Sequence, residues 1–592
     1  MTDGNKKSFW TTLPGVLTAI AGILGSIAAI LTILNPSTPP IEDLNPIIEE
    51  FIAIPFEIEE GETTTLKWDV SGPGSDLKVT IDQGIGEVVS SGTIVVTLEK
   101  STAFTLSVVD GKGRKDKETI QVIVKERIET SSDSGGRDIV VDSIGGGDHL
   151  TISNAINAAE DGDTILIHPG IYREGLVIDK RLRILGDGDL GDVVIKATGE
   201  NVLRFITPSA EVSNLVLKQE VKQEGGGDFY AVDIETGSPI LKDCDITSQS
   251  LTCVAVHGDA DPHIYGNKIH DSKEGGIVVY YDGLGTIEDN DIYGNALAGI
   301  AISKGGEPTI SNNKIHDGKG SGISVYDHGL GTIEYNDIYG NAYSGIVIKE
   351  GGDPTIRKNE IHDGKSSGIY VSYDGLGTIE DNDIYGNDLA GIEIKEGGDP
   401  TIRKNKIRNG KSSGISVYDY GLGTIEDNDI YGNALAGIWI SEGGNPTISN
   451  NEIHDGEWSG ISVYNDGLGT IEDNDIYGNA LAGIEIKEGG NPTISNNEIH
   501  DGDSHGIYVY DDGLGTIKDN DIYGNALAGI WITEGGNPTV TGNRINKNGY
   551  KAIVIYHGGA GIFKDNDLRD NDLGAWGISE DSKPLDLGGN VE

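Results

Sequence analysis

Apolar residues over most of the chain recur in short alternating runs that glycine-containing turns interrupt. In the stretch 286–308 they are Ile287, Ile292, Ile300 and Ile302. Alternation with a period of two residues predicts β-strands, and no run has the length or the period of about 3.6 residues that a helix requires. The pattern therefore predicts three short strands, joined by turns, in each stretch of this kind.

This unit repeats every 23 residues, and pairs of units repeat every 46 residues almost letter for letter. A fixed period of this length indicates a stack of structural repeats. The word Gly-Leu-Gly-Thr begins at Gly283, Gly329, Gly375, Gly421, Gly467 and Gly513. An asparagine recurs at the shorter step, at Asn267, Asn290, Asn313, Asn336, Asn359, Asn382, Asn405, Asn428, Asn451, Asn474, Asn497, Asn520, Asn543 and Asn566.

A single unit is too small to fold alone. Burial of its four aliphatic side chains yields roughly 6 to 12 kcal/mol, whereas ordering its backbone costs on the order of 1 to 2 kcal/mol per residue. Stacked units let each strand pair with its copies above and below, so that one isoleucine core runs through the array. Asparagine tolerates left-handed turn geometry and its amide both donates and accepts, so we expect neighbouring copies to bond each other at every turn.

The repeat differs from two other solenoid repeats. Leucine-rich repeats need a Leu-x-x-Leu-x-Leu strand and a longer return segment, and calcium-binding nonapeptide repeats need Gly-Gly-x-Gly-x-Asp; the chain has neither. Its pattern, Asn-x-Ile-x-x-Asn-x-x-x-Gly-Ile-x-Ile, resembles the right-handed parallel β-helix repeat of the pectate-lyase-like superfamily. The resemblance covers roughly residues 138–592 and implies an all-β solenoid with 23-residue coils.

Within that superfamily the chain is most similar to the carbohydrate-binding and sugar-hydrolysing β-helix subgroup. This subgroup includes bacterial and archaeal surface proteins, periplasmic copper-maturation proteins and eukaryotic F-box proteins. Because the superfamily includes lyases, hydrolases, epimerases and binding modules, the resemblance implies a fold rather than one activity. The stretch 149–163 predicts a short helix with Thr151 as N-cap and Gly162 just past its end. It resembles the first coil of such proteins, where a helix covers the open end of the core.

The N-terminal part of the chain predicts a membrane anchor. Residues 9–34 carry no charge, and this run is long enough to cross about 30 Å of hydrocarbon as a helix. A cleaved signal peptide is the alternative, but its apolar core is usually shorter. Lys6 and Lys7 precede the run, so the positive-inside rule predicts a cytoplasmic N-terminus at 1–8, a spacer at 35–45 and an extracytoplasmic location for the rest.

Residues 46–126 have a different pattern, that of several longer strands. The alternating runs lie at 63–68, 77–81, 92–97, 104–109 and 118–124, separated by Gly and Asp turns. Their spacing predicts a small β-sandwich with Trp68 in its core. The segment is similar to bacterial immunoglobulin-like modules, and a flexible linker follows at 127–137.

Composition narrows the classes of partner. The net charge of −51 at pH 7 argues against binding nucleic acid or anionic lipid, because like charges repel. The only two cysteines, Cys244 and Cys253, are too few for a disulfide scaffold, and their pairing stays open.

The sequence signal for a catalytic or metal site is weak. Acidic residues such as Glu288, Asp289 and Asp291 recur nearly unchanged from unit to unit, whereas a catalytic pair is a unique local arrangement. Histidines such as His270 and His316 recur every second unit, about 9.6 Å apart, which is too far for a shared metal ion. We therefore assign no catalytic residue, metal ligand or cofactor, and calcium binding by the acidic turns stays open.

The third strand of each unit is a better candidate for function. If Ile323 and Val325 point inward, then Ser324 and Tyr326 point outward. Aromatic side chains suit strands in any case, but the residue types at these outward positions vary from unit to unit, as at Ser372. The aromatic residues also have charged neighbours in the sequence, which are Glu393, Glu485, Lys349, Lys395 and Lys487. The predicted substrate-binding residues are Tyr280, Tyr326, Tyr370, Tyr418, Trp439, Tyr464, Tyr508, Tyr510 and Trp531.

Three functions follow from this pattern. The first is a membrane-anchored, surface-displayed β-helix that binds a polysaccharide or a protein ligand without catalysis. The second is a polysaccharide lyase or hydrolase whose site lies in the less regular coils 203–252, where Glu220, Lys222, Glu224, Asp228 and Asp233 interrupt the repeat. The third is a passive structural stalk.

Overall fold

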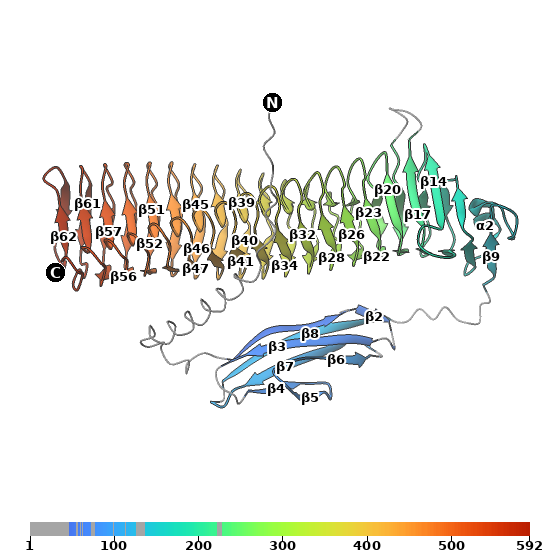
Figure 1. Ribbon diagram of the computed structural model, residues 1–592, viewed down its shortest axis with the longest axis horizontal. Helices are drawn as coiled ribbons and strands as arrows, with labels where there is room; N and C mark the ends of the chain where they lie inside the picture. Colours follow the sequence, from blue (N-terminus) through green and yellow to red (C-terminus); the bar gives the residue numbers. More distant parts are fainter. Residues whose placement is uncertain are drawn as a thin grey trace, which may run out of the picture. The chain divides into compact units, whose positions relative to one another are not determined.

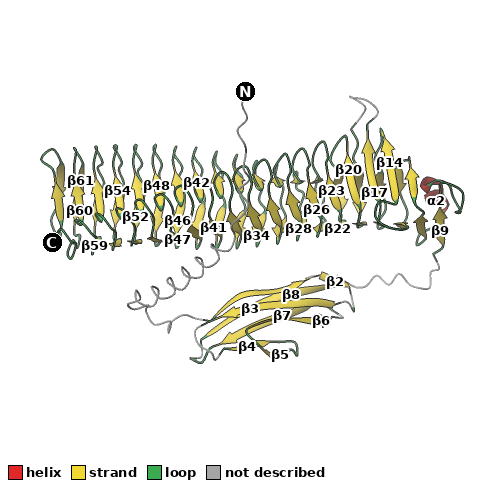
Figure 2. Cartoon of the chain, viewed as in Figure 1, coloured by secondary structure: helices red, strands yellow, loops and turns green. Residues whose placement is uncertain are grey.

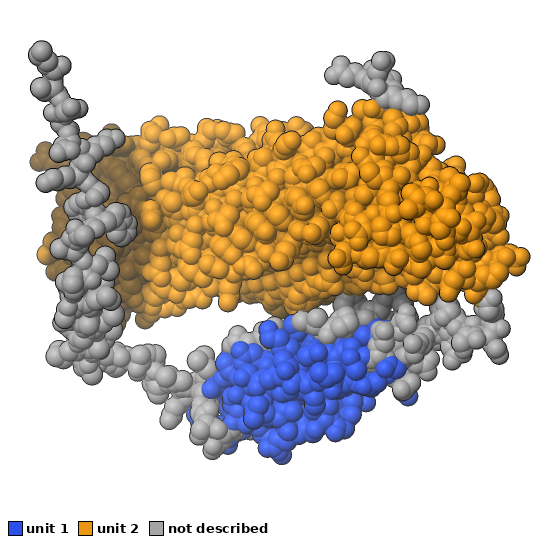
Figure 3. Space-filling view, turned by 45° about the vertical axis from the view of Figure 1, so that its right-hand side comes forward, with its two compact units in different colours: residues 1–133 blue, residues 134–592 orange. Residues whose placement is uncertain are grey.

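A computed structural model describes residues 46–54, 57–59, 61, 63–72, 77–98, 100–112, 114–125, 136–221 and 228–592. The chain divides into two compact units, residues 1–133 and 134–592, which Figure 3 shows in different colours. Strands dominate both units (Figure 2).

The first unit contains two β-sheets that share one apolar core. One sheet has the order β1 (Ile47–Ile54), β3 (Thr63–Ser71), β6 (Ser91–Thr97). The other has the order β2 (Glu57–Glu59), β8 (Lys115–Lys125), β7 (Thr102–Val109), β4 (Lys78–Ile81), β5 (Gly86–Val88). The common core holds Phe51, Leu66, Trp68, Val79 and Phe104, so Trp68 is buried as expected.

The predicted β-sandwich and immunoglobulin-like module are not established by this arrangement. The five predicted strands are present, but β1, β2 and β5 were not foreseen. Alternation along a strand determines which residues face the core, and it leaves the pairing partners of that strand open. The predicted linker falls largely outside the described residues.

The second unit is the predicted all-β parallel solenoid, with about 19 turns, and its stacked turns are seen in Figure 1. Its first sheet runs from β9 (Asp138–Val141) and β10 (Thr164–Ile167) through every third strand to β61 (Ala560–Lys564) and β63 (Lys583–Asp586). The second has 17 strands, from β11 (Gly170–Tyr172) to β59 (Arg544–Asn546). Each strand pairs in parallel with its copy in the next turn, as Ile300 does with Ile323.

The third sheet has 18 strands and positions the candidate site. Its strands are β12 (Leu176–Ile178), β15 (Leu203–Phe205), β18 (Val232–Gly237), β21 (Val254–Ala260), β24 (Ile277–Tyr280), β27 (Ile300–Ile302), β30 (Ile323–Val325), β33 (Ile346–Ile348), β36 (Ile369–Val371), β39 (Ile392–Ile394), β42 (Ile415–Val417), β45 (Ile438–Ile440), β48 (Ile461–Val463), β51 (Ile484–Ile486), β54 (Ile507–Val509), β57 (Ile530–Ile532), β60 (Ile553–Ile555) and β62 (Trp576–Ile578).

The repeat pattern translates directly into this core. The unit 286–308 forms β25 (Thr286–Glu288), β26 (Asp291–Tyr293) and β27, which are the three predicted strands. Ile287, Ile292, Ile300 and Ile302 are all buried in one continuous cluster. At the open end, α2 (Ile152–Ala158) packs on β9, β10 and β12, with the Thr151 side chain accepting the Asn154 N–H at its N-terminus. The predicted covering helix and its N-cap are therefore confirmed, but the helix ends at Ala158 with Ala159 as C-cap, not just before Gly162.

The asparagine ladder is also present. The backbone N–H and the side-chain Nδ2 of Asn290 both donate to Oδ1 of Asn313, each at 3.0 Å. The expected left-handed geometry, however, falls one residue earlier, on Asp289 (φ 53°), Asn312 (φ 54°) and their counterparts. The residue before the asparagine makes the turn, and the asparagine side chain points inward to bond the stack.

The predicted localisation needs correction. Among the described residues, no helix is long and apolar enough to cross a membrane. The predicted anchor 9–34, with the flanking segments 1–8 and 35–45, lies outside those residues. The prediction of a membrane-anchored, extracytoplasmic protein is therefore wrong on the described residues, because an uncharged run in a sequence is only one of the conditions for a membrane span.

Candidate functional site

The predicted aromatic residues form two parallel rows on the outer face of the third sheet. The centre row consists of the middle residues of the strands, in which Ser416, Trp439 and Ser462 pair in register. The exit row lies two residues further along each coil. There the backbone N–H of Tyr464 donates to Ile440 O at 3.0 Å, so that the hydrogen-bond ladder of the sheet extends to this row. Tyr370, Trp439, Tyr508 and Trp531 belong to the centre row, and Tyr280, Tyr326, Tyr418, Tyr464 and Tyr510 belong to the exit row; all nine are partly buried.

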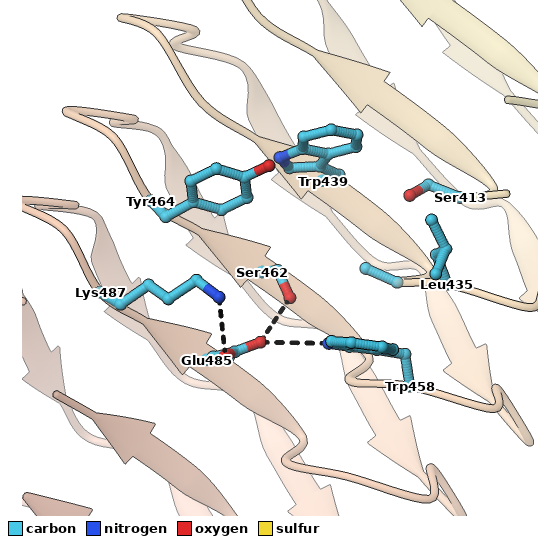
Figure 4. A pocket seen from close by; sticks show the side chains of 9 residues that line it. Ser413, Leu435, Trp439, Trp458, Ser462, Tyr464, Glu485 and Lys487 are labelled. Atoms are coloured by element: carbon cyan, nitrogen blue, oxygen red, sulfur yellow. Dashed lines mark hydrogen bonds and ion pairs between the residues drawn. The ribbon is translucent and has the colours of Figure 1, made fainter. Parts of the chain in front are cut away.

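A hollow of about 170 Å³ opens on this face between β42 and β51. Trp439 and Trp458 contribute its aromatic walls, and Glu485 and Lys487 lie at one side (Figure 4). The rest of the lining comes from the two rows and from the turns that precede the strands: Ser413, Leu435, Ala436, Ser462 and Tyr464.

Glu485 organises one side of the hollow. The carboxylate is almost fully buried, at 7% exposure. Oε1 accepts from Tyr510 Oη at 2.5 Å and pairs with Lys487 Nζ at 3.4 Å. Oε2 accepts from Ser462 Oγ at 3.0 Å, and from Trp458 Nε1 and Ser459 Oγ at 3.4 Å each.

The state of this carboxylate follows from those contacts. Burial alone would raise the pKa of Glu485, but the hydrogen bond from Tyr510 and the charge of Lys487 hold that pKa below its usual value. Glu485 is therefore an ionised group whose lone pairs are occupied by protein donors. It holds Trp458 and Lys487 in place rather than offering a free acceptor.

Trp439 and Ser413 each bring a buried polar atom to the hollow. Trp439 stacks on Tyr464 with ring centroids 5.4 Å apart and planes 19° apart. Within the described part of the chain, Ser413 Oγ is buried without a hydrogen bond, and the buried Trp439 Nε1 has only the side chain of Tyr464 as a partner. Ser413 is 1% exposed. Buried polar groups usually have a partner, so an orphan hydroxyl in this hollow indicates a place for a ligand with hydrogen-bonding groups.

The other predicted residues lie in separate groups along the rows. Tyr370 and Tyr418 flank Lys395, whose Nζ lies 5.5 and 5.7 Å from their ring centroids. Lys349 lies 5.4 Å from the ring centroid of Tyr326. Ser372, expected to shape the outer face, is instead fully buried.

Nearer the C-terminus, Trp531 belongs to a filled aromatic cluster rather than to the hollow. Its ring centroid lies 4.8 Å from that of His505 and 5.6 Å from that of Tyr556. Tyr508 and Tyr510 stack on each other at 4.3 Å. Burial lowers the pKa of His505 to about 4, so its imidazole is neutral at pH 7.

Sequence reasoning missed Trp458 and Ser413, although one signal was available. Trp458 replaces the leucine or serine that most units carry at this turn position, as at Leu435 and Ser412. It is 40% exposed, and its indole reaches Glu485 from a turn rather than from a strand.

A second polar cluster lies in the irregular coils. Asp233, 8% exposed, accepts from Asn201 Nδ2 at 3.0 Å and lies 3.0 Å from His257 Nε2. The hydrogen bond to Asp233 raises the pKa of His257. Tyr280 Oη lies 3.3 Å from Tyr230 Oη beside them. Of the residues predicted for an enzyme site, Asp233 lies in this cluster, Glu220 pairs instead with Lys196 at 3.0 Å, and Lys222 and Glu224 fall outside the described residues.

The second sheet carries a stack of alternating histidine and tyrosine rings. The ring centroid of His362 lies 5.3 Å from that of Tyr339 and 4.7 Å from that of Tyr385, and the ring planes are 14° and 2° apart, respectively. Each such histidine bonds two aspartates, as His362 does with Asp363 at 2.9 Å and Asp337 at 3.0 Å. The described residues contain no cluster of three or more His, Cys, Asp or Glu side chains that could hold a metal ion.

Comparison with known proteins identifies the family. The family model "Right handed beta helix region" matches residues 226–353, 298–453 and 437–590, which together make up more than half of the chain. The chain belongs to the right-handed beta helix family. None of the curated proteins matches its sequence.

Several solved structures resemble this right-handed beta helix protein. They include the A-module of the mannuronan C-5 epimerase AlgE6 from Azotobacter vinelandii (15% identity, 74% of this chain, 92% of that chain, TM-score 0.21). Others are the pectate lyase Pel9A (13%, 54%, 79%, 0.30) and the PL6 family alginate lyase AlyGC (12%, 77%, 100%, 0.32). At identities and scores this low, the activities of these enzymes do not transfer to the chain.

Proposed function

We propose that the outer face of the third sheet binds carbohydrate without altering it chemically. The observation that carries this proposal is the hollow between Trp439 and Trp458, with the unpartnered buried hydroxyl of Ser413. Aromatic faces offer an apolar surface on which the C–H groups of a sugar ring can rest. The hydroxyl groups around the rim of the same ring can accept from Trp439 Nε1 and can bond Ser413 Oγ.

Binding without catalysis agrees with the state of Glu485. A general acid needs a raised pKa, and a general base needs a lone pair within reach of the substrate. Glu485 has a lowered pKa, and Tyr510, Lys487, Ser462, Trp458 and Ser459 surround its oxygens. A protein ligand is the alternative occupant, but a small hollow between aromatic side chains suits a sugar ring better than an extended peptide.

The test uses a glycan array on the full chain, followed by calorimetry with the glycans that bind. Trp439→Ala and Trp458→Ala should each weaken binding, and the double variant should bind about tenfold or more weakly. A stacked ring contributes roughly 0.5 to 1.5 kcal/mol, so two rings at the upper end of that range exceed the roughly 1.4 kcal/mol that corresponds to a tenfold change in affinity. Tyr343→Ala is the matched control, because Tyr343 occupies the turn position of Trp458 in another coil and is 64% exposed. Unchanged affinity in the folded double variant would favour the stalk.

The Asp233–His257 pair favours a second candidate function, a polysaccharide lyase or hydrolase. A histidine held by a buried carboxylate is the usual arrangement of a general base. Incubation of polysaccharides with the full chain, read by reducing ends and by ultraviolet absorbance of unsaturated products, tests it. Turnover that His257→Ala abolishes would establish this function, and absence of turnover across the array glycans would reject it.

A further inference from the structure

The group of side chains around Glu485 has a second copy four turns nearer the N-terminus. We call Glu485, Lys487, Tyr510 and Ser459 the 485 set, and their counterparts 92 residues earlier, Glu393, Lys395, Tyr418 and Ser367, the 393 set. Tyr418 Oη donates to Glu393 Oε1 at 2.5 Å, as Tyr510 does to Glu485. Ser367 Oγ donates to Glu393 Oε2 at 2.5 Å, as Ser459 does to Glu485 at 3.4 Å.

The lysine of each set lies over two aromatic rings, of which Tyr418 and Tyr510 are counterparts and Tyr370 and Tyr464 are not. Lys395 lies over the rings of Tyr370 and Tyr418, and Lys487 lies 5.2 and 5.5 Å from the ring centroids of Tyr464 and Tyr510. The sets thus share a carboxylate bonded by a tyrosine and a serine, with an ammonium group over two aromatic rings.

Trp439 lies midway between the two sets. Its immediate neighbours in the centre row are Ser416 and Ser462, and Glu393 and Glu485 follow two strands away on either side. With strands about 4.8 Å apart, each glutamate lies about 10 Å from Trp439 along the stack, and the two glutamates are about 19 Å apart. The row is also symmetric in residue type: Tyr370, Glu393, Ser416, Trp439, Ser462, Glu485, Tyr508.

The charges of this face favour a neutral ligand. Lys349, Lys395 and Lys487 each lie beside a glutamate, at 3.2 Å from Glu350, 3.9 Å from Glu396 and 3.4 Å from Glu485. A carboxylated sugar would therefore have to compete for each of these ammonium groups. It would also be repelled by a chain with a net charge of −51.

We infer that Trp439 is the shared middle of two half-sites, and that one extended neutral polysaccharide lies along the stack over the 393 set, Trp439 and the 485 set. This inference rests on the proposed function and adds the class of ligand and its direction. A ligand that reaches both sets gains the second contact intramolecularly, so that its affinity rises without a new kind of interaction.

The experiment measures the affinity of the full chain for cello-, laminari-, manno- and xylo-oligosaccharides of increasing length, from disaccharide to octasaccharide. We expect the octasaccharide of at least one series to bind about tenfold or more tighter than its disaccharide. Glu393→Gln should remove most of this gain, whereas Glu485→Gln, which alters the border of the hollow itself, should weaken the binding of the disaccharide as well. Tyr418→Phe, which retains the ring, should act like Glu393→Gln. Glu472→Gln, on the first sheet, is the control.

The outcomes separate the two proposals. If Trp439→Ala weakens binding but Glu393→Gln and Tyr418→Phe leave the octasaccharide affinity unchanged, the half-site inference is wrong and the proposed function stands. If neither a neutral series nor any glycan of the array binds, both are wrong. Tighter binding of an octagalacturonate than of every neutral octasaccharide would overturn the assignment to neutral ligands.

Discussion

Oδ1 of Asn451 accepts two hydrogen bonds from Asn428, one from its backbone N–H at 3.0 Å and one from its side-chain Nδ2 at 2.9 Å. The same Nδ2 also lies 2.9 Å from the carbonyl oxygens of Ile402 and Glu426. Asn428 is 2% exposed. Each ladder asparagine therefore bonds its own turn, the previous turn and the next, in a place that water does not reach.

The first prediction concerns this ladder. Asn428→Ala should leave the backbone N–H of Asn405 and the carbonyl of Ile402 without their buried partner. The cost should be about 1 to 3 kcal/mol of unfolding free energy. Thermal denaturation of the full chain measures it, with the exposed Asn445→Ala as control. Equal melting midpoints for Asn428→Ala and the parent would show that the ladder has no such role.

The second prediction concerns the histidine and tyrosine stack. Burial would lower the pKa of His362, but its hydrogen bonds to Asp363 and Asp337 outweigh burial and raise it. A raised folded-state pKa means that the stabilisation is complete below the unfolded value of about 6.5 and is lost as pH rises through the folded value. The melting advantage of the parent over His362→Gln should therefore be complete below about pH 6.5 and shrink as the pH rises above it.

The chain supplies the control for this second prediction. Arg408 replaces histidine in one unit, bonds Asp383 at 2.9 and 2.7 Å and lies 4.3 Å from the ring centroid of Tyr385. His362→Arg reproduces that arrangement. Its melting midpoint should stay above that of His362→Gln at high pH, because arginine does not titrate there. A melting-midpoint difference between the parent and His362→Gln that grows with pH would contradict a raised pKa for His362.

The third prediction concerns a close approach between turns. A Cβ atom on Gly437 would lie 2.5 Å from Ile453 Cγ2 and 2.7 Å from Gly460 O. Gly437→Ala should therefore force the backbone apart and destabilise the fold by about 1 to 3 kcal/mol. Gly410→Ala, whose Cβ would meet Asn433 Oδ1 at 3.1 Å, should be milder in the same melting experiment. The reverse order would contradict the packing described above.

The fourth prediction concerns the two cysteines, whose pairing the sequence left open. Both are free and fully buried, and burial raises the pKa of Cys244 and Cys253 to about 12. A thiol-specific reagent at about pH 8 should label neither residue in the folded chain and both after denaturation without reductant. Denatured chains that release thiols only after reduction would instead show a disulfide.

Part of the candidate site was predictable. Trp439, Tyr464, Glu485 and Lys487 were all singled out from the third-strand phase, because alternation places every second residue on the outer face. The phase argument also placed Trp531 and Ser372 there, yet Trp531 packs among other rings and Ser372 is buried. Pointing outward from a strand does not determine exposure, since side chains of neighbouring turns can cover each other.

The spacing of residues such as Ile287, Ile310 and Asn290 determined the solenoid, its 23-residue turn and its core. In this fold each strand pairs with a copy at constant sequence separation, so periodicity along the chain specifies the contacts. Only the tertiary structure decided that Trp458 and Ser413 join Trp439 in one hollow. Both come from turns, where no alternation determines the direction of a side chain, and their distance from Trp439 depends on how successive turns stack.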